Sequence, residues 1–326
     1  MKALTYERYG GPEVVRVEDV DAPSPRDGEI LIRVHASAVN TADWRIRAAA
    51  FPGILAIPGR LMFGIFSPRN PRLGSEFAGV VERVGPSARR FKPGVRVFGM
   101  ATSGGATAEL FAVPETGAIA EMPASLTFEE AAAVPFGALC ALVFLSDYAG
   151  LKPGQKVLIA GASGGVGTYA VQIAKALGAH VTGVAGPESQ DFVASLGADV
   201  TIDYRKTDLT ALEGDFDVVI DTYGMISPRL SRNLLVEGGL FLPLNFGLRE
   251  IGAIFLNSFR TRKIRLAVNE DRMDDMLRIA DLIEAGKLRP VIDSVYPLAE
   301  AARAHRQVEA RHKRGAVVLR IEGASE

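Results

Sequence analysis

A glycine-rich stretch, Lys156 to Gly167, constrains the fold of this chain more than any other part of the sequence. It opens with the apolar run Val157-Leu158-Ile159-Ala160, which is typical of a buried parallel strand. A helical pattern follows over Thr168–Leu177, where apolar residues recur at steps of three and four positions. Gly178 stands where a left-handed helix cap is expected, and a second apolar run begins at Val181. The order strand, glycine turn, helix, strand predicts a turn whose backbone N–H groups hold a pyrophosphate.

The glycines match the dinucleotide-binding pattern G-x-G-x-x-G only in part. Gly164 and Gly167 supply its second and third glycines, and Ala162 stands where we expect the first. An ordinary strand-to-helix loop is the alternative interpretation. The flanking strand and helix favour the dinucleotide site, and we assign four turn residues to cofactor binding: Ser163, Gly164, Gly165 and Val166.

Length, charge and cysteine content narrow the possible classes of protein. The 326 residues suffice for two domains, and 37 basic against 38 acidic residues give a net charge of −1, which disfavours a nucleic-acid surface. The longest uncharged run, Ala131–Ser146, contains Pro135 and is shorter than the ~20 residues of a membrane span. No apolar signal segment follows Met1, and the single cysteine, Cys140, excludes an intrachain disulfide. We therefore expect a cytoplasmic protein with a small-molecule substrate and with neither nucleic acid nor membrane as partner.

The two parts of the chain have different patterns. Residues 1–124 contain many short apolar or alternating segments separated by turn clusters, which predicts a closed or partly closed β-barrel. From Ser125, strands alternate with helical segments, which predicts an α/β domain with a doubly wound parallel sheet. Ser125 or Thr127 caps its first helix. The expected strands are Val14–Val20, Glu29–Val39, Phe77–Val84, Val95–Phe98, Glu109–Val113, 156–161, 180–184, 199–202, 216–221, 238–244 and Ala316–Ile321.

One segment fits neither pattern. Phe51–Phe66 is apolar and contains two prolines and three glycines, so we expect a long loop. It is either a core loop or a flap beside the substrate, since long apolar loops in compact domains are often functional.

Several further motifs extend over the whole chain. With the glycine turn they are Val39-Asn40-Thr41-Ala42-Asp43, Gly74-Ser75-Glu76-Phe77-Ala78-Gly79, Phe91-Lys92-Pro93-Gly94, 128–135, 170–175 and Leu196-Gly197-Ala198-Asp199. Together they resemble the zinc-free, quinone-oxidoreductase-like branch of the medium-chain dehydrogenase/reductase superfamily. The resemblance implies a GroES-like β-barrel catalytic domain (1–124 and 269–326), a Rossmann dinucleotide-binding domain (125–268) and a homodimer, with Lys263–Val268 as a possible edge strand.

The zinc alcohol dehydrogenases of the same superfamily carry a cysteine where this chain has Asn40 and a histidine where it has Ser75. A catalytic zinc needs about three good protein ligands and an open position. Asp43 and Glu76 cannot complete that set, so we expect no metal.

The resemblance also assigns residues to the cofactor. Asn40 corresponds to a residue near the nicotinamide ribose and the substrate, and it is our catalytic candidate. Cys140 takes the place of a threonine that points toward the nicotinamide, although a lone cysteine is usually packing. Tyr223, Phe246 and Gly247 follow expected strands at their carboxyl ends, where doubly wound sheets bind ligands.

The end of the second expected strand bears on the choice of nucleotide. NAD enzymes usually keep an acid there, but this chain has Ala185 and Gly186, which leave room for a 2′-phosphate. Tyr204 matches a family tyrosine that lies against the phosphate, and Arg205 or Lys206 adds charge. A solvated basic turn is the alternative, and Glu188 would repel a phosphate. We expect NADPH, with NADH possible.

The expected activity is hydride transfer from NAD(P)H to a quinone or an α,β-unsaturated carbonyl, without zinc. Asn40 would stabilise the developing negative charge. Trp44, Phe63 and Tyr223 are candidates for the substrate pocket, although Trp44 and Phe63 are most simply core aromatics. Two rivals remain at this stage: a metal-using alcohol dehydrogenase, and a catalytically inert nucleotide-redox sensor that kept the fold.

Overall fold

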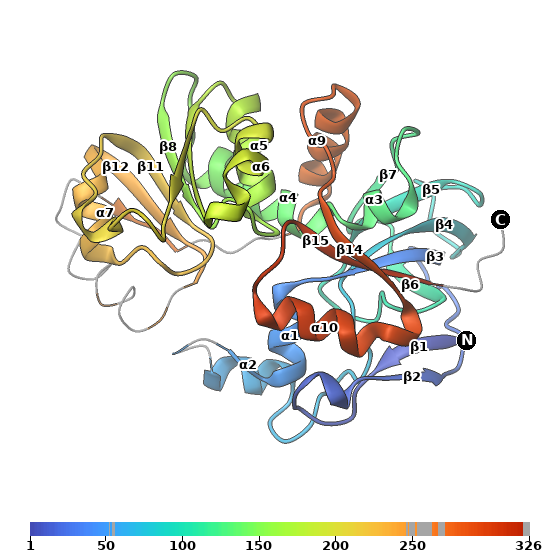
Figure 1. Cartoon of the computed structure of the whole chain (residues 1–326). Helices are drawn as coiled ribbons and strands as arrows, with labels where there is room; N and C mark the ends of the chain where they lie inside the picture. Colours follow the sequence, from blue (N-terminus) through green and yellow to red (C-terminus); the bar gives the residue numbers. More distant parts are fainter. Residues whose placement is uncertain are drawn as a thin grey trace. The chain divides into compact units, whose positions relative to one another are not determined.

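The computed structural model describes residues 1–51, 53, 56–245, 247, 252, 263–266 and 271–321. The chain divides into two compact units, which Figure 1 shows coloured along the sequence. The first comprises Met1–Phe51, Ala56–Leu139 and Glu270–Glu326. The second comprises Cys140–Asn269 and the short segment Pro52–Leu55. Residues 125–139, which we expected in the nucleotide-binding domain, thus belong to the first unit.

The first unit is built around β3 (Glu29–Val39), whose apolar residues are buried on both faces. This strand pairs antiparallel with three others. Its eleven residues give room for partners that pair with different stretches, 29–33, 30–36 and 36–39. The seven-stranded sheet has the order β14-β15-β3-β4-β5-β7, with β6 also on β3, and β1 and β2 form a separate pair. The strands are β1 (Lys2–Thr5), β2 (Arg16–Asp19), β4 (Glu76–Val84), β5 (Arg96–Met100), β6 (Leu110–Pro114), β7 (Ala118–Glu121), β14 (Ile292–Pro297) and β15 (Ala316–Arg320).

Several helices of the first unit pack on this sheet. The β3 strand leads directly into α1 (Thr41–Ala48), and α10 (Ala301–Ala310) contributes Ala304 and Val308 to the same core. The others are η1 (Pro12–Val14), α2 (Ala56–Phe63), α3 (Phe128–Ala132), α9 (Met273–Glu284) and η6 (Leu298–Glu300). The chain passes into the second unit within α4 (Pro135–Leu142), which continues as the π-helical turn η3 (Val143–Tyr148).

Two long-range contacts explain why α3 belongs to the first unit. The His35 ring of β3 stacks on Phe128, with ring centroids 4.1 Å apart. The guanidinium of Arg320, at the end of β15, donates from Nε to Oε1 of Glu129 at 2.8 Å. Thr127 caps α3 through a capping box with Glu130, so of the two caps considered it is Thr127 that caps the helix.

The second unit contains a six-stranded parallel sheet in the order β10-β9-β8-β11-β12-β13. This is the strand order of the dinucleotide-binding fold, and it reverses between β8 and β11. Its strands are β8 (Lys156–Ala160), β9 (His180–Ala185), β10 (Val200–Asp203), β11 (Phe216–Asp221), β12 (Leu235–Pro243) and β13 (Lys263–Ile264). The doubly wound parallel sheet is therefore confirmed.

Helices cover both faces of this sheet. Figure 1 shows α5 (Gly167–Ala176) and α6 (Gln190–Ser195) together on one side and α7 (Pro228–Leu234) on the other. Leu230 and Leu234 of α7 join a buried cluster with Leu158, Val184 and Phe241 of the strands. Short 3-10 turns η4 (Pro187–Ser189) and η5 (Leu209–Ala211) complete the unit.

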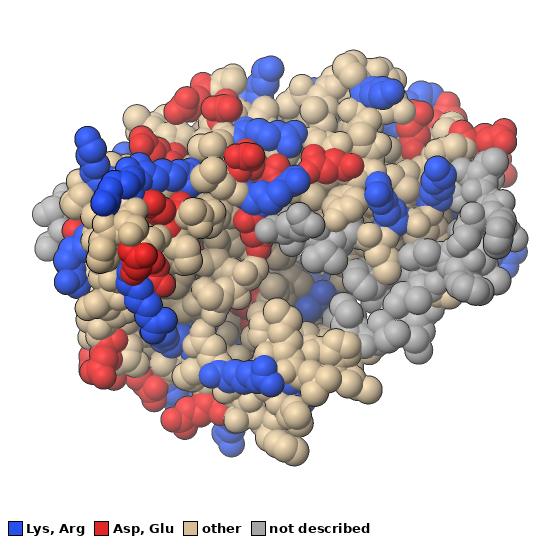
Figure 2. Space-filling model, turned by 180° about the vertical axis from the view of Figure 1, so that it is seen from behind, with Lys and Arg blue, Asp and Glu red and all other residues tan. Residues whose placement is uncertain are grey.

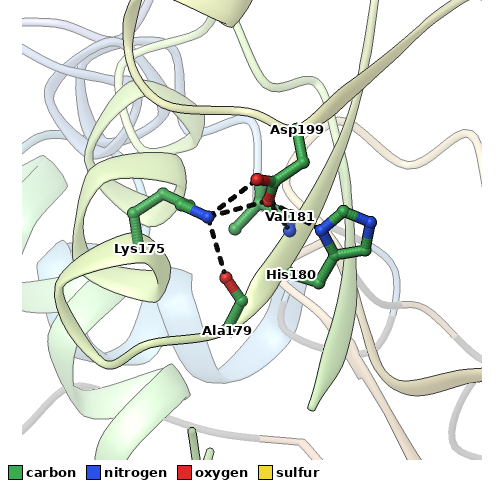
Figure 3. A network of polar contacts seen from close by, with 5 residues as sticks. All are labelled: Lys175, Ala179, His180, Val181 and Asp199. Carbon is green, nitrogen blue, oxygen red and sulfur yellow. Dashed lines mark hydrogen bonds and ion pairs between the residues drawn. The ribbon is translucent and has the colours of Figure 1, made fainter. Parts of the chain in front are cut away.

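An ion-pair network connects the end of α5 with the start of β9 and the residue before β10 (Figure 3). Nζ of Lys175 lies 2.9 Å from both carboxylate oxygens of Asp199 and donates to the carbonyl of Ala179. Asp199 also accepts from the N–H of Val181 at 2.7 Å and lies 3.0 Å from Nδ1 of His180. Gly178 has a φ of +82°, as its predicted role of left-handed cap requires.

Two expectations for the first unit were wrong. The segment Phe51–Phe66 is not a loop throughout, because α2 forms within it. Pro58 is the third residue of that helix, where a missing N–H costs no intrahelical bond. Val14 is not the start of a strand but ends the turn η1, and β2 begins only at Arg16.

Among the described residues, no helix combines the length and apolar character needed to cross a membrane. Basic and acidic side chains are interspersed over the face shown in Figure 2, without a broad region of one sign.

Candidate active site

The glycine turn of the second unit is shaped by Gly161, a residue that we did not assign to the cofactor. Gly161 has a φ of +77°, and a Cβ there would lie 2.5 Å from Oγ1 of Thr222. Thr222 in turn donates from that oxygen to the carbonyls of Ala160 and Gly161, at 2.9 and 3.2 Å. Gly161 therefore makes the tight turn that we expected at position 162. The spacing Gly161, Gly164, Gly167 was visible in the sequence and is the signal that identifies it.

The third glycine allows helix and strand to approach. A Cβ on Gly167 would lie 2.1 Å from the carbonyl oxygen of Gly161 and 2.8 Å from Cα of Ala162, both backbone atoms. At Gly164 the nearest atom to a Cβ would be the carbonyl oxygen of Gly161 at 3.3 Å, a close contact that a small shift relieves. Packing within the turn therefore constrains Gly164 less than Gly167.

Helix α5 begins without a side-chain cap. Val166 occupies the N-cap position and its side chain makes no capping hydrogen bond. Within the described part of the chain, no protein acceptor receives the N–H groups of Gly165 or Val166. The N-terminal backbone donors of a helix carry partial positive charge and bind anions. The turn therefore offers a binding site for a phosphate group at the carboxyl end of β8.

A buried carboxylate shapes the neighbouring loop after β11. Asp221 accepts from the N–H groups of Tyr223, Gly224 and Ile226 at 3.0, 2.7 and 2.6 Å. Burial raises its pKa, and these hydrogen bonds oppose the rise. The amide of Asn245 donates to the carbonyl of Tyr223 at 2.9 Å. This loop presents the Tyr223 side chain at the surface, 41 % exposed, at the strand end beside the glycine turn.

The side chain of Glu188, just after β9, bears on the choice of nucleotide. A Cβ on Gly186 would lie 2.7 Å from Oε1 of Glu188, so that carboxylate folds back over Gly186. Oε2 of Glu188 lies 3.9 Å from Nη1 of Arg205, whose guanidinium is 5.9 Å from the Tyr204 ring centre. Tyr204 donates its backbone N–H to the carbonyl of Ala185 at 3.3 Å. The structure thus brings Ala185, Gly186, Tyr204 and Arg205 together, with Glu188 among them.

Asn40 lies in a buried polar cluster of the first unit. Its Oδ1 accepts from the N–H groups of Ala42 and Asp43, at 2.8 and 3.1 Å, and thereby caps α1. Its Nδ2 donates to Oγ of Ser75 and to Oε2 of Glu76, both at 2.9 Å. All the hydrogen-bonding groups of this amide are thus engaged within the unit.

Two buried carboxyl groups complete the cluster. Burial raises the pKa of Asp43 and of Glu76 to about 7, against hydrogen bonds from Asn40 and its neighbours that oppose the rise. Oε1 of Glu76 accepts the N–H of Phe136 at 2.8 Å, and Ser75 lies 3.4 Å from Oδ1 of Asp43. Lys313 is half-buried, and desolvation lowers its pKa while the charges of Glu76 and Asp293 oppose that change.

These residues do not fit a zinc ion. The Oδ1 atom of Asn40 is committed to the start of α1, and Glu76 is held by Asn40 and Phe136. Across the part of the chain that the structure describes, no three His, Cys, Asp or Glu side chains come close enough together to hold a metal. The imidazole or thiolate ligands that zinc prefers are replaced here by an amide and a hydroxyl.

The other predicted site residues have diverse environments. Trp44 packs partly buried against the core of the first unit, and Phe63 stacks on Phe51 with ring centroids 5.5 Å apart. Cys140 is a half-buried cysteine on α4 that forms no disulfide, and Gly247 is half-buried. Phe246 lies outside the described residues.

Comparisons with known proteins show the family of the chain. Residues 26–124 match the family model of the alcohol dehydrogenase GroES-like domain, and residues 196–319 match that of the zinc-binding dehydrogenases. The quinone oxidoreductase of Sus scrofa is 34 % identical over 97 % of this chain and 95 % of its own length.

Solved structures show the same fold over the full chain. The quinone oxidoreductase of Coxiella burnetii superposes with a TM-score of 0.87 at 28 % identity, covering 99 % of both chains. The Escherichia coli quinone oxidoreductase complexed with NADPH gives a TM-score of 0.83 at 26 % identity, covering 98 % of this chain and 100 % of its own.

The fold and the site define an oxidoreductase with one GroES-like unit and one Rossmann unit. The chain belongs to the quinone-oxidoreductase-like branch of the medium-chain dehydrogenase/reductase superfamily. The resemblance noted in the sequence is thereby confirmed.

Proposed function

We propose that this protein is a zinc-independent, NADPH-dependent reductase of quinones or α,β-unsaturated carbonyl compounds. The observation that carries the proposal is the uncapped N-terminus of α5 beside Gly161 and Gly164, at the point where the strand order of the sheet reverses. Ligands of doubly wound sheets bind in the crevice at this reversal. The relatives named quinone oxidoreductase, one of them complexed with NADPH, support the same choice.

The residues present fit a dinucleotide. Backbone N–H groups of Gly165 and Val166 would receive the pyrophosphate, and the loop that Asp221 orders would place Tyr223 beside it. Ser163, Gly164, Cys140 and Gly247 complete the proposed contacts in the second unit. When bound, NADPH supplies a hydride to an electrophilic carbon.

Selectivity for the phosphate of NADPH rests on the end of β9. Ala185 and Gly186 place no acid toward a ribose 2′-hydroxyl, whereas Tyr204 and Arg205 offer a donor and a cation. Glu188 opposes the phosphate, since its carboxylate lies over Gly186. We therefore propose a modest preference for NADPH, with NADH also accepted.

In the first unit we propose Asn40 as the catalytic residue. A substrate oxygen would replace Ser75 as acceptor of one Asn40 N–H group. The second N–H group would keep its bond to Glu76, which is charge-assisted when that carboxyl is ionised. The amide dipole would then stabilise negative charge that develops on the oxygen. Asp43 and Glu76 point into the protein, so we propose that solvent supplies the final proton. Trp44, Phe63 and Tyr223 remain proposed contacts of the substrate.

Zinc independence rests on the donor set. Asn40 and Ser75 stand where the zinc enzymes have cysteine and histidine, and both are engaged with protein partners. A neutral amide and a hydroxyl are poor zinc ligands. No step of the proposed reaction requires a Lewis acid.

One experiment tests the proposal. The purified protein is given NADPH or NADH with a quinone, an enone or an aldehyde, and nucleotide oxidation is followed with and without strong chelator. We expect oxidation with the quinone or enone, faster with NADPH and unchanged by chelator. Aldehyde turnover that chelator abolishes and zinc restores would support a metal-using alcohol dehydrogenase. Tight NADPH binding without any turnover would support a nucleotide-redox sensor.

We also propose a homodimer. Among the strands that the structure describes, β13 (Lys263–Ile264) is the last of the parallel sheet, and an edge strand can pair with a second copy. Light scattering of the purified protein measures the mass directly.

A further inference from the structure

We propose that helix α2 and the residues after it form a docking surface for an anionic lipid bilayer. Five large apolar side chains are exposed within ten positions: Ile57 at 73 %, Leu61 at 54 %, Met62 at 67 %, Ile65 at 49 % and Phe66 at 92 %. We call these five residues the apolar ridge. Only six other large apolar side chains are exposed among the described residues, and they are scattered over the sequence. A contiguous exposed apolar patch marks an interaction site.

The ridge is held in a defined orientation by contacts on its other side. The Tyr9 hydroxyl donates to the carbonyl of Gly64 at 2.7 Å, and the Arg60 guanidinium lies 4.6 Å from the Tyr9 ring centre. Phe63 stacks on Phe51. Gly64 has a φ of +127°, and a Cβ there would lie 1.9 Å from the carbonyl oxygen of Ser67. The backbone therefore turns sharply after α2 and keeps the apolar side chains directed outward.

The charged residues of the segment that carries the ridge are all arginines. From Trp44 to Ser75 the sequence contains five arginines and no Asp or Glu, although the whole chain is nearly neutral. Arg47 is buried in an ion pair, but Arg69 and Arg72 are exposed and Arg60 is half-buried. In the part of the chain that the structure describes, none of these last three forms an ion pair; Arg60 and Arg69 donate to backbone carbonyls of the same segment instead.

Apolar side chains flanked by unneutralised arginines complement an anionic bilayer. The apolar groups enter the boundary between headgroups and acyl chains, and the guanidinium groups bind lipid phosphates. A second copy of this chain suits the surface less well, because a two-fold interface would place the arginines beside one apolar ridge against the arginines beside the other. The expectation of no membrane partner rested on the lack of a spanning segment, which does not bear on contact at the bilayer surface.

The test is flotation of the full-length protein with lipid vesicles. One set contains phosphatidylcholine alone, and the other contains about 30 % phosphatidylglycerol, which gives the vesicle surface a negative potential. We expect flotation with the anionic vesicles, weaker flotation with neutral vesicles, and release as salt approaches about 1 M, where the Debye length falls to ~3 Å.

Two variants separate the apolar and the charged contributions. Ile57→Ser with Leu61→Gln and Phe66→Ser should lower affinity for anionic vesicles at least ~tenfold through lost apolar burial. Arg69→Glu with Arg72→Glu should lower it by a similar factor, since each basic residue near the surface contributes about fivefold. Matched controls are Leu277→Gln with Val295→Ser, and Arg83→Glu, which change exposed residues of the same unit. The controls should bind as the wild type does.

Three outcomes would overturn the proposal. These are no flotation with anionic vesicles, flotation that the ridge variants leave unchanged, and a mass shift in light scattering that only the ridge variants abolish. The last result would identify a second copy as the occupant. All exposed substitutions should keep the wild-type melting temperature, so failure to fold is detected separately.

Discussion

Nδ2 of Asn40 donates to Oε2 of Glu76 at 2.9 Å, inside the first unit and away from solvent. The other oxygen of Glu76 accepts the N–H of Phe136, so one carboxyl group joins the end of β3 to the start of β4 and of α4. By the resemblance, the zinc enzymes carry a metal-binding cysteine at the position of Asn40 and a histidine at that of Ser75, which accepts the other N–H of Asn40. In this chain these residues and Glu76 form a hydrogen-bonded cluster. Ionisation of Glu76 should change the free energy of unfolding.

The first prediction concerns pH. The pKa of Glu76 is about 7 in the folded chain, against an ordinary value of 4.5 for an exposed glutamate, because burial disfavours its charged form. Between these values the unfolded chain loses a proton that the folded chain retains, so stability falls as pH rises from 4.5 to 7. Glu76→Gln removes this loss. The free energy of unfolding of the variant, relative to wild type, should rise by up to about 3 kcal/mol over that interval and stay level above it.

Urea unfolding at a series of pH values measures the difference. Glu7→Gln changes an exposed acid of the same unit and serves as the control, whose profile should parallel that of the wild type. A pH-independent difference for Glu76→Gln would mean that this carboxyl is already ionised in the folded chain at acidic pH.

The second prediction separates folding from nucleotide binding at the glycine turn. In Gly167→Ala the new Cβ meets backbone atoms at 2.1 and 2.8 Å, so helix α5 must shift, at a cost of about 1–3 kcal/mol. In Gly164→Ala the nearest atom is 3.3 Å away and φ is not positive, so stability should change by less than about 1 kcal/mol. Nucleotide affinity should nevertheless fall in Gly164→Ala. Calorimetric titration with NADPH, beside thermal melts, tests both; full affinity in Gly164→Ala would make the turn a simple connector.

The third prediction concerns nucleotide preference. The Glu188 carboxylate lies over Gly186 and 3.9 Å from Arg205, where it competes with a 2′-phosphate. Glu188→Gln should therefore strengthen NADPH binding about three- to tenfold and leave NADH nearly unchanged. Ala185→Asp should reverse the preference, and Tyr204→Phe with Arg205→Ala should erode it. Dissociation constants at one low salt concentration decide the matter, with Glu213→Gln as an exposed control. If the wild type binds NADH more tightly, Glu188 dominates and the phosphate assignment fails.

The fourth prediction concerns the network of Figure 3. Burial would raise the pKa of Asp199, but the Val181 N–H and Lys175 outweigh it and lower the pKa below its ordinary value of 3.8. The stabilisation is therefore present above pH 3.8 and is lost as pH falls through the folded value. Asp199→Asn should cost about 1–3 kcal/mol at pH 7 and less at a pH below the folded pKa of Asp199. Asp191→Asn, on the exposed side of α6, is the comparison in denaturant unfolding. Equal costs at both pH values would exclude the ionic contribution.

The fifth prediction concerns a buried ion pair. The Arg47 side chain is fully buried and its Nη2 lies 2.7 Å from Oε2 of Glu309, which joins α1 to α10. Glu309→Ala leaves a buried guanidinium without its counterion, and we expect a loss of about 3–5 kcal/mol. Adding Arg47→Met should restore part of that loss, since the double variant buries no charge. Denaturant unfolding measures both; a single variant as stable as wild type would show that water solvates Arg47.

Expected and observed elements agree where the sequence within the element sets its conformation. β3 and β11 have the predicted bounds, because their alternating or continuous apolar patterns are properties of the local sequence. Gly178 caps α5 as expected, since a left-handed position favours glycine whatever surrounds it. By contrast, α2 was predicted as a loop, because Pro58 and the nearby glycines outweigh the helical pattern when position within the helix is unknown.

The sequence by itself determined the parallel sheet, the phosphate turn and the family, because these depend on spacing along the chain. Only the tertiary structure decided that Gly161 makes the tight turn, since the Thr222 side chain, which follows β11, hydrogen-bonds to it. It also decided that Asn40 is engaged by Ser75 and Glu76, and that residues 125–139 join the first unit. These features depend on contacts between residues more than thirty positions apart, and no local pattern encodes such a contact.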